Sequence, residues 1–301
     1  MKKLVVNADD FGYCPERNRG IVESYLHGDV TTASLMANTD AAEDAIKLAV
    51  LHAIPLGLHL NLTEGRPVSN RLRAGSSLVD GDGWFHGKLG VRKTAYSGSL
   101  DTAEVGEEIE AQLRWFADRL GKPPTHIDGH NHVHVLPGVR DVFAAAAAAA
   151  GVGWIRLPVQ CDLPACPWVS EAQQDFFKEV EEDCRDAQQV FLQNGLKLTD
   201  SFVGLATMGS DMSVQRVCDS LRAAYKSANQ EASSPGRSHV TCEIMVHPGY
   251  PSMLGCGGCG QGPDEFSLSH DRHHEMTVLG DERLKTFYKE EGIELSSFTD
   301  L

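Results

Sequence analysis

Two adjacent carboxylates near the start of the chain, Asp9 and Asp10, are the first residues that could perform chemistry. They follow the apolar run Leu4 to Val6, which predicts a buried strand, and a glycine at position 12 can then turn the chain. Neighbouring side chains on a strand point to opposite faces, but this constraint lapses where the strand ends. One carboxylate could then hold a metal ion while the other accepts a proton. An ordinary turn made of Asp and Gly is the alternative.

Three later segments also place histidines at the ends of short apolar runs. His59 lies in one of them, and His247 ends another just before a Pro-Gly turn. The segment 125–134 contains four histidines, among them His130. Loops at strand ends that carry acids and imidazoles are how α/β folds build catalytic sites. Four such strand ends in one chain therefore predict a metalloenzyme.

The other residues of the histidine-rich segment are expected to have different roles. His126 precedes His130 by four positions, a spacing that suits a pair of ligands on a helix, but the residues around it predict a strand. Asp128 is expected to orient a ligand histidine instead of binding the metal itself. His132 and His134 are expected to contact substrate or solvent.

Charged residues further along the chain could support the site. Arg156 ends its own short apolar run and is expected to pair with Asp9, which would keep that carboxylate ionised and oriented. A surface salt bridge is the alternative. In the charged segment near the C-terminus, Arg272 and Glu275 could help to close the site, while the histidines beside them are expected to be solvated.

The composition excludes some classes of partner. A formal net charge of −15 and a pI near 5.3 disfavour nucleic acid and anionic membranes, which select basic surfaces, and fit a neutral or cationic small substrate. The sequence shows no secretory h-region and no apolar stretch near 18 residues, so a cytoplasmic protein is expected. Eight cysteines are scattered along the chain. Only Cys256 and Cys259 have metal or redox spacing, and a glycine-rich loop is the preferred interpretation there.

Expected strands alternate with expected helices, which favours a mostly parallel sheet with helices outside it, as a barrel or as an open wound sheet. No linker divides the candidate site segments, so one domain over residues 1–301 is expected. Residues 65–100 are expected to form a long excursion and 227–238 a polar loop. The expected helices are 17–28, 40–52, 103–120, 139–150 and 170–192, and the expected strands after the first are 30–36, 55–62, 125–128, 154–158, 202–206 and 240–246.

Four motifs resemble the YdjC family of carbohydrate deacetylases, also called the chitooligosaccharide deacetylase family. They are NADDFG from Asn7, GLHLNLTEG from Gly57, THIDGHNHVHVLPGV from Thr125 and VHPGY from Val246, and they occur in the family's order along nearly the whole chain. The resemblance implies an α/β fold, a distorted (β/α) barrel of mostly parallel strands with outer helices. Its site would lie at the carboxyl ends of the strands.

The resemblance also implies a role for each site residue. Asp10, His59 and His130 would hold one divalent metal ion, Asp9 would be the catalytic base, and His247 would be the acid or the oxyanion partner. The implied reaction removes acetyl groups from N-acetylated carbohydrates or oligosaccharides, which requires a nucleophilic water, a stabilised oxyanion and a proton for the departing amine. The family resemblance names magnesium, whereas one carboxylate with two imidazoles also suits zinc, nickel or cobalt.

Two other functions stay open at this point. One is a metal-dependent phosphoesterase or amidohydrolase on a similar barrel, for which Arg66, Arg71 and Arg73 are the only hint of a phosphate site. The other is a non-catalytic barrel that binds carbohydrate, which the loss of the base or the acid would favour. The sugar, the chain length, the native metal and the oligomeric state, including a homodimer, are not determined by the sequence.

Overall fold

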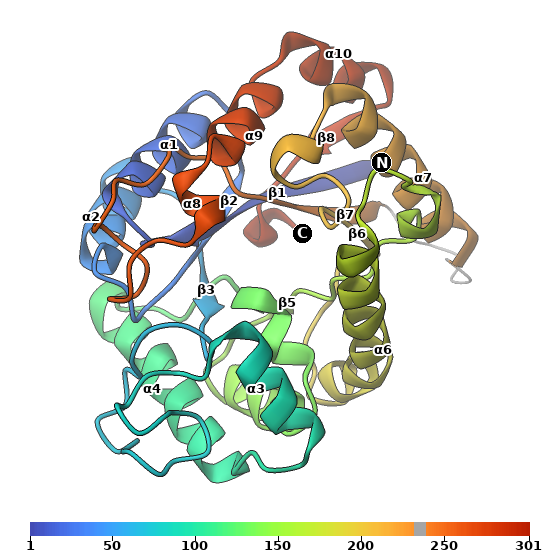
Figure 1. Cartoon of the computed structure of the whole chain (residues 1–301). Coiled ribbons are helices and arrows are strands. Elements are labelled where there is room, and N and C mark those ends of the chain that lie inside the picture. Colours follow the sequence, from blue (N-terminus) through green and yellow to red (C-terminus); the bar gives the residue numbers. More distant parts are fainter. Residues whose placement is uncertain (232–238) are drawn as a thin grey trace.

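The computed structural model describes residues 1–231 and 239–301, whose strands form one parallel sheet ringed by helices (Figure 1). The strands are β1 (Lys2–Phe11), β2 (Thr32–Leu35), β3 (Leu56–Leu60), β4 (His126–Gly129), β5 (Trp154–Ile155), β6 (Ser201–Val203), β7 (Val240–Val246) and β8 (Ile293–Leu295). The α-helices are α1 (Pro15–Leu26), α2 (Ala42–His52), α3 (Gly87–Tyr96), α4 (Thr102–Leu120), α5 (Arg140–Ala149), α6 (Glu171–Gln193), α7 (Val214–Glu231), α8 (Glu265–Leu268), α9 (Asp271–Leu279) and α10 (Glu282–Glu290). Short 3-10 turns are η1 (His130–Val135), η2 (Leu163–Ala165), η3 (Gly209–Asp211) and η4 (Phe298–Asp300).

The sheet curls into a distorted barrel with the order β5-β4-β3-β2-β1-β7-β6, and all of its strand pairs are parallel. β1 is the central strand: β7 lies along one side of it, and β2 and β8 share the other side. Between the edge strands β5 and β6, Lys197 forms a parallel bridge to Trp154, so the seam of the barrel is narrow. The expected (β/α) barrel is therefore confirmed over the open wound sheet.

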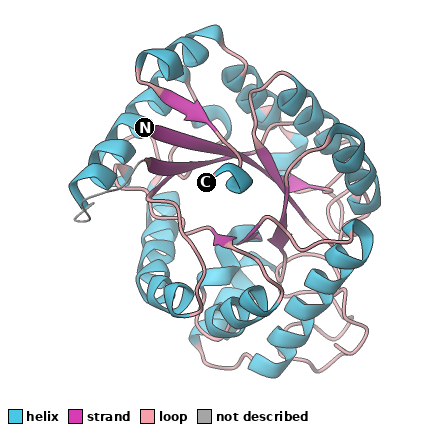
Figure 2. Cartoon of the chain, turned by 180° about the vertical axis from the view of Figure 1, so that it is seen from behind, coloured by secondary structure: helices cyan, strands magenta, loops and turns pink. Residues whose placement is uncertain are grey.

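The core lies inside the curled sheet and between the sheet and its helices, which surround the strands in both views (Figures 1 and 2). Leu4, Val6 and Ala8 of β1 have no exposed surface, and neither has Leu58 of β3. Strands buried on both faces read as nearly continuous apolar runs, which is why the short runs in the sequence predicted them. Each fully buried leucine contributes about 1.5–3 kcal/mol relative to an exposed one.

Two expectations about loops were wrong in part. The excursion 65–100 ends in the helix α3, which brings part of this segment back to the barrel. Residues 227–231 belong to α7, and the remainder of the expected polar loop lies outside the described residues. Within the described part of the chain, no helix is long and apolar enough to cross a membrane.

Candidate metal centre

The two adjacent carboxylates serve one site because the backbone of β1 is irregular there. The register between β1 and β2 shifts between Ala8 and Phe11, and Asp10 has a φ of 63°. This left-handed conformation is uncommon for a residue with a side chain, and Asp tolerates it better than most. The strand therefore does not end before the pair, as expected, but continues through a bulge to Phe11. Both Asp9 and Asp10 line the same cavity.

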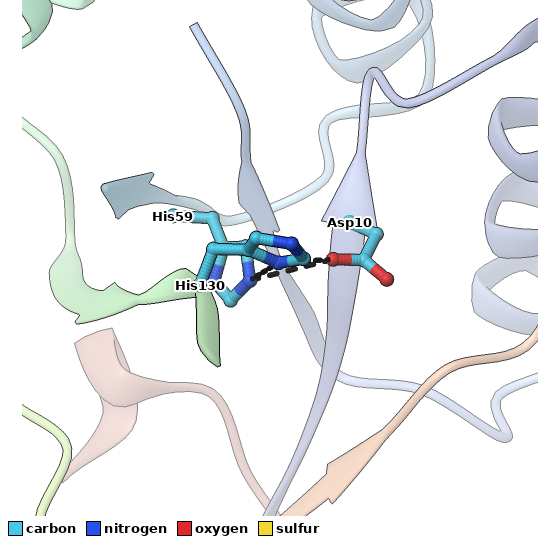
Figure 3. Close-up of side chains that lie close together, drawn as sticks. All are labelled: Asp10, His59 and His130. Atoms are coloured by element: carbon cyan, nitrogen blue, oxygen red, sulfur yellow. Dashed lines mark hydrogen bonds and ion pairs between the residues drawn. The ribbon is translucent and has the colours of Figure 1, made fainter. Parts of the chain in front are cut away.

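Asp10, His59 and His130 converge on one point (Figure 3). Asp10 Oδ1 lies 3.4 Å from His59 Nε2 and 3.2 Å from His130 Nδ1, and these two nitrogens are 3.2 Å apart. His59 is on β3, and His130 directly follows β4. The buried Asp10 Oδ1 has no hydrogen-bond partner among the described residues. One carboxylate oxygen and two imidazole nitrogens in this arrangement are a suitable ligand set for a divalent metal ion.

The remaining polar atoms of the three side chains are held by neighbours. His59 Nδ1 lies 2.5 Å from Asp128 Oδ1, and His130 Nε2 lies 3.1 Å from Glu64 Oε1. Arg272 Nη2 donates to Asp10 Oδ2 at 2.9 Å. Hydrogen bonds of this kind fix which atom of a ligand faces the metal.

The charges around the cluster set its protonation. Although burial favours the neutral imidazole, the carboxylates of Asp128 and Asp9 raise the pKa of His59 to about 9. Burial likewise opposes the charged form of His130, but Glu64 and Asp10 raise its pKa to about 10. Burial alone would raise the pKa of Asp10, and the positive charge of Arg272 helps to hold it well below its usual value. Metal binding at this cluster would therefore compete with protons on the imidazoles.

A second group of buried charges holds Asp9. Arg156 donates to both of its carboxylate oxygens at 2.6 Å, and Asn7 Nδ2 donates to Asp9 Oδ1 at 2.8 Å. The same guanidinium lies 3.0 Å from Asp128 Oδ2 and 2.8 Å from Glu243 Oε1. Arg156 is almost completely buried, so its pair with Asp9 is not a surface salt bridge. Burial disfavours its charge, but the three carboxylates raise the pKa of Arg156 well above its usual value.

His247 follows β7 at the same end of the barrel, and its backbone N–H donates to Glu275 Oε2 at 2.6 Å. Its ring nitrogen Nδ1 is 3.6 Å from that oxygen. Glu275 also accepts from the backbone N–H of Gly209 at 2.7 Å. Arg272 and Glu275 lie one turn apart on α9. Arg272 contacts Asp10 and Glu275 contacts His247, so this helix packs against the site, in line with the expectation that these two residues help to close it.

A cavity of about 660 Å³ opens above the cluster. Asp9, Asp10, His59, His130 and His247 all line it, and the rings of Phe176 and Phe266 form part of its wall. A second set of close ligand atoms comes from Asp9, His59 and Asp128. Asp128 is completely buried and does not line the cavity. Its carboxylate is already paired with the guanidinium of Arg156. The first cluster is therefore the better metal site.

The other expectations have mixed outcomes. His126 is not part of the cluster: its Nε2 bonds Asn7 Oδ1 at 2.9 Å, and burial lowers its pKa to about 4. His134 is buried with Nε2 donating to the backbone oxygen of Arg156 at 3.0 Å, so the expectation of substrate or solvent contact was wrong for it. His132 lines the cavity. Cys256 and Cys259 are not joined by a disulfide; Cys256 is exposed and Cys259 is buried.

Sequence reasoning gave no role to Glu64 or Glu243. Glu64 lies inside the quoted GLHLNLTEG motif, three residues after a turn-forming Asn61, and this position was the available signal. Glu243 looked like an ordinary residue of a strand, and only the fold brings it to Arg156.

The fold and the site together define a class of protein: a parallel α/β barrel with an acid–imidazole cluster at the carboxyl ends of its strands, where barrel enzymes place their catalytic groups. The chain belongs to the YdjC-like family, because the family model described as YdjC-like protein matches residues 3–290. The family resemblance of the sequence motifs is thereby confirmed.

Two relatives and one solved structure show how far the similarity extends. The chain is 48% identical to a mouse (Mus musculus) protein named carbohydrate deacetylase over 99% of this chain and 94% of that one. It is 42% identical to a chitooligosaccharide deacetylase of Yersinia pestis over 48% of this chain and 56% of that one. A solved structure from Enterococcus faecalis, provisionally described as a cellobiose-phosphate cleavage protein, superposes with a TM-score of 0.71 at 23% identity, covering 99% of this chain and 98% of the other. At that identity the superposition shows a shared fold.

Proposed function

We propose that this chain is a metal-dependent deacetylase that hydrolyses the acetamide group of N-acetylated carbohydrates or oligosaccharides. The observation that carries the proposal is the convergence of Asp10 Oδ1, His59 Nε2 and His130 Nδ1 in a cavity that Asp9 and His247 also line. The full-length similarity to a protein named carbohydrate deacetylase supports the substrate class. The proposed enzyme is a hydrolase of a linear amide bond.

Asp10, His59 and His130 are the proposed ligands. The buried Asp10 Oδ1 supports this fit, because it makes no hydrogen bond of good geometry with the described residues and faces two imidazole nitrogens at 3.2 and 3.4 Å, so a cation between the three atoms would satisfy it. A divalent cation bound there would polarise the acetyl carbonyl and lower the pKa of the attacking water. Two imidazoles and one carboxylate favour zinc or another transition metal, and magnesium remains the alternative from the family resemblance.

The chain's own side chains would move the protons. Asp9 is held in one orientation by two hydrogen bonds from Arg156, and it lines the cavity, so as a carboxylate it can accept a proton from the attacking water. His247 lines the cavity from a different strand and can donate a proton to the departing amine. Glu275 fixes the position of His247 through its backbone N–H.

The two alternatives have less support. Of the arginines that hinted at a phosphate site, Arg66 donates to the backbone oxygen of Asp82 and Arg71 pairs with Glu107, and neither lines the cavity. A barrel that only binds sugar would not need a buried base held in a fixed orientation.

The test measures acetate release from N-acetylated sugars and chitooligosaccharides, using metal-stripped enzyme and enzyme restored with one metal at a time. We expect release only after restoration. His130→Ala should lose both metal and activity, whereas the matched control His273→Asn, an exposed histidine outside the cavity, should keep both. Full metal occupancy of His130→Ala by elemental analysis would refute the ligand set, and metal-independent acetate release would refute the metal dependence.

A further inference from the structure

Glu64 contacts a proposed metal ligand but takes no part in the mechanism above. It lies four residues after β3 on the wall of the cavity, and its Oε1 is 3.1 Å from His130 Nε2. Its side chain is 26% exposed, whereas Asp128, which contacts His59, is completely buried. Of the two carboxylates that face the ring nitrogens turned away from Asp10, Glu64 is therefore the one that can be changed without opening the core.

The chemistry of imidazole gives this contact a direction. His130 presents Nδ1 to Asp10 Oδ1 and to His59 Nε2, so Nδ1 must carry a lone pair when a metal binds. A neutral imidazole has one ring proton, which must then be on Nε2. Glu64 Oε1 is placed to accept that proton in a hydrogen bond. Without an acceptor at this place, the His130 ring could flip, or it could bind the metal through Nε2 instead of Nδ1.

The backbone holds Glu64 in this place. Asn61 Oδ1 accepts from the backbone N–H of Thr63 at 2.9 Å and of Glu64 at 3.1 Å, and Asn61 Nδ2 donates to the Glu64 carbonyl at 2.8 Å. This side-chain turn fixes the local chain. Asn131, the neighbour of His130, donates to Thr63 Oγ1 at 3.2 Å. Two contacts thus join the loops after β3 and β4: the Glu64 carboxylate with His130, and the Thr63 hydroxyl with Asn131.

We propose that Glu64 is a positioning residue that sets the tautomer and ring orientation of His130 for metal binding. The inference rests on the proposed function, because it requires His130 to be a ligand. It extends that function by giving each ligand histidine its own carboxylate, Asp128 for His59 and Glu64 for His130. Loss of such a partner typically lowers metal affinity by about 10- to 100-fold.

The experiment compares Glu64→Ala and Glu64→Gln with the wild type in full-length protein. Glutamine keeps an oxygen that can accept from Nε2–H, so Glu64→Gln should retain most of the affinity, while Glu64→Ala should bind Zn²⁺ about 10- to 100-fold more weakly in competition with a chelator. The matched control is Glu107→Ala. Glu107 is likewise a glutamate that contacts the segment after β3: it accepts hydrogen bonds from Ser69 and Arg71. Among the described residues it has no histidine partner. The Zn²⁺ affinity of the Glu107→Ala variant should equal that of the wild type.

A second readout is independent of activity. In Zn²⁺-loaded protein with ¹⁵N-labelled histidine, the ring-nitrogen shifts report which nitrogen of His130 is bound and which carries the proton. We expect Nε2–H in the wild type and in Glu64→Gln, and a mixture of the two forms in Glu64→Ala. A single unchanged form in Glu64→Ala, with affinity within about twofold of the wild type, would overturn the inference even if activity fell.

Failure of the proposed function gives a different pattern. If no N-acetylated sugar is hydrolysed but Glu64→Ala still weakens Zn²⁺ binding and mixes the tautomers, the positioning role stands and the deacetylase proposal fails. If His130→Ala binds Zn²⁺ like the wild type, His130 is not a ligand and both fail together. Thermal unfolding of each variant shows that the measured protein is folded.

Discussion

Replacing Arg156 with methionine should destabilise this protein more than any change of a surface ion pair. The side chain is completely buried and binds three carboxylates at once, with contacts of 2.6 Å to Asp9, 2.8 Å to Glu243 and 3.0 Å to Asp128. Arg156→Met keeps most of the apolar stem and removes the charge. Glu243 then loses its cationic partner, while Asp128 and Asp9 keep only His59 as an ion-pair partner within the described part of the chain.

The expected cost follows from the loss of a buried partner, which is about 3–5 kcal/mol in comparable cases. In a chain of this size the corresponding fall in Tm is on the order of 10 °C. The loss should also depend on pH. Burial already raises the pKa of Glu243 to about 7, although Arg156 opposes this shift. Without Arg156 the pKa of Glu243 in the fold rises further above its unfolded value, so the deficit should grow as pH rises through 7 and shrink towards pH 5.

Urea denaturation at about pH 5 and about pH 8 tests this prediction on metal-free protein. The matched control is Arg140→Met, which removes a 3.0 Å pair with the exposed Asp186 and should cost about 1 kcal/mol or less. The double variant with Glu243→Gln should recover part of the loss at the higher pH. A cost for Arg156→Met no larger than that of the control, or a deficit that grows on acidification, would refute the reasoning.

Four further variants test the remaining assignments. Asp9→Asn should keep the metal and slow the chemical step by about 10² or more, whereas Asp10→Asn should weaken metal binding first; equal loss of metal in elemental analysis of the two would contradict this division. His247→Asn should slow acetate release while metal content and substrate affinity stay near wild type, and the high-pH limb of its rate profile should shift or vanish. A normal pH profile with normal turnover would leave His247 only a structural role. Burial lowers the pKa of His126 to about 4, so the free energy of unfolding should decrease as pH falls from about 6.5 to about 4, and His126→Gln should reduce that slope by about one proton; denaturation curves that show the same slope would exclude this contribution.

Much of the fold was predictable because its signals are local. The helix expected at 40–52 is α2 at Ala42–His52, and the one expected at 103–120 is α4 at Thr102–Leu120, since both have a clear apolar face. Closure of the barrel was not predictable from the residues. It depends on the seam between β5 and the segment at Lys197, and an open sheet would have the same apolar runs.

The candidate site was predictable to the extent that chemistry follows strand ends. The strand-end pattern predicted that carboxylates and imidazoles would meet at one face, and the family resemblance selected Asp10, His59 and His130 among them; these three side chains do converge. Arg272 could be given only a general role, because it reaches Asp10 across 262 positions of sequence and no local pattern encodes that contact. The bulge in β1 was also missed, since an Asp in a left-handed conformation leaves no signal in the hydrophobic pattern.

The left-handed backbone at Asp10 limits how this site can be re-engineered. A replacement there must offer a ligand atom and also tolerate a φ of 63°, and among common side chains Asp and Asn best combine the two. Glu and Cys are ligands in many metal sites, but each would add backbone strain of about 1–3 kcal/mol at this position. Attempts to change the metal preference should therefore vary positions 59 and 130, where the chain has ordinary strand geometry at His59 and φ below zero at His130, and leave position 10 as it is.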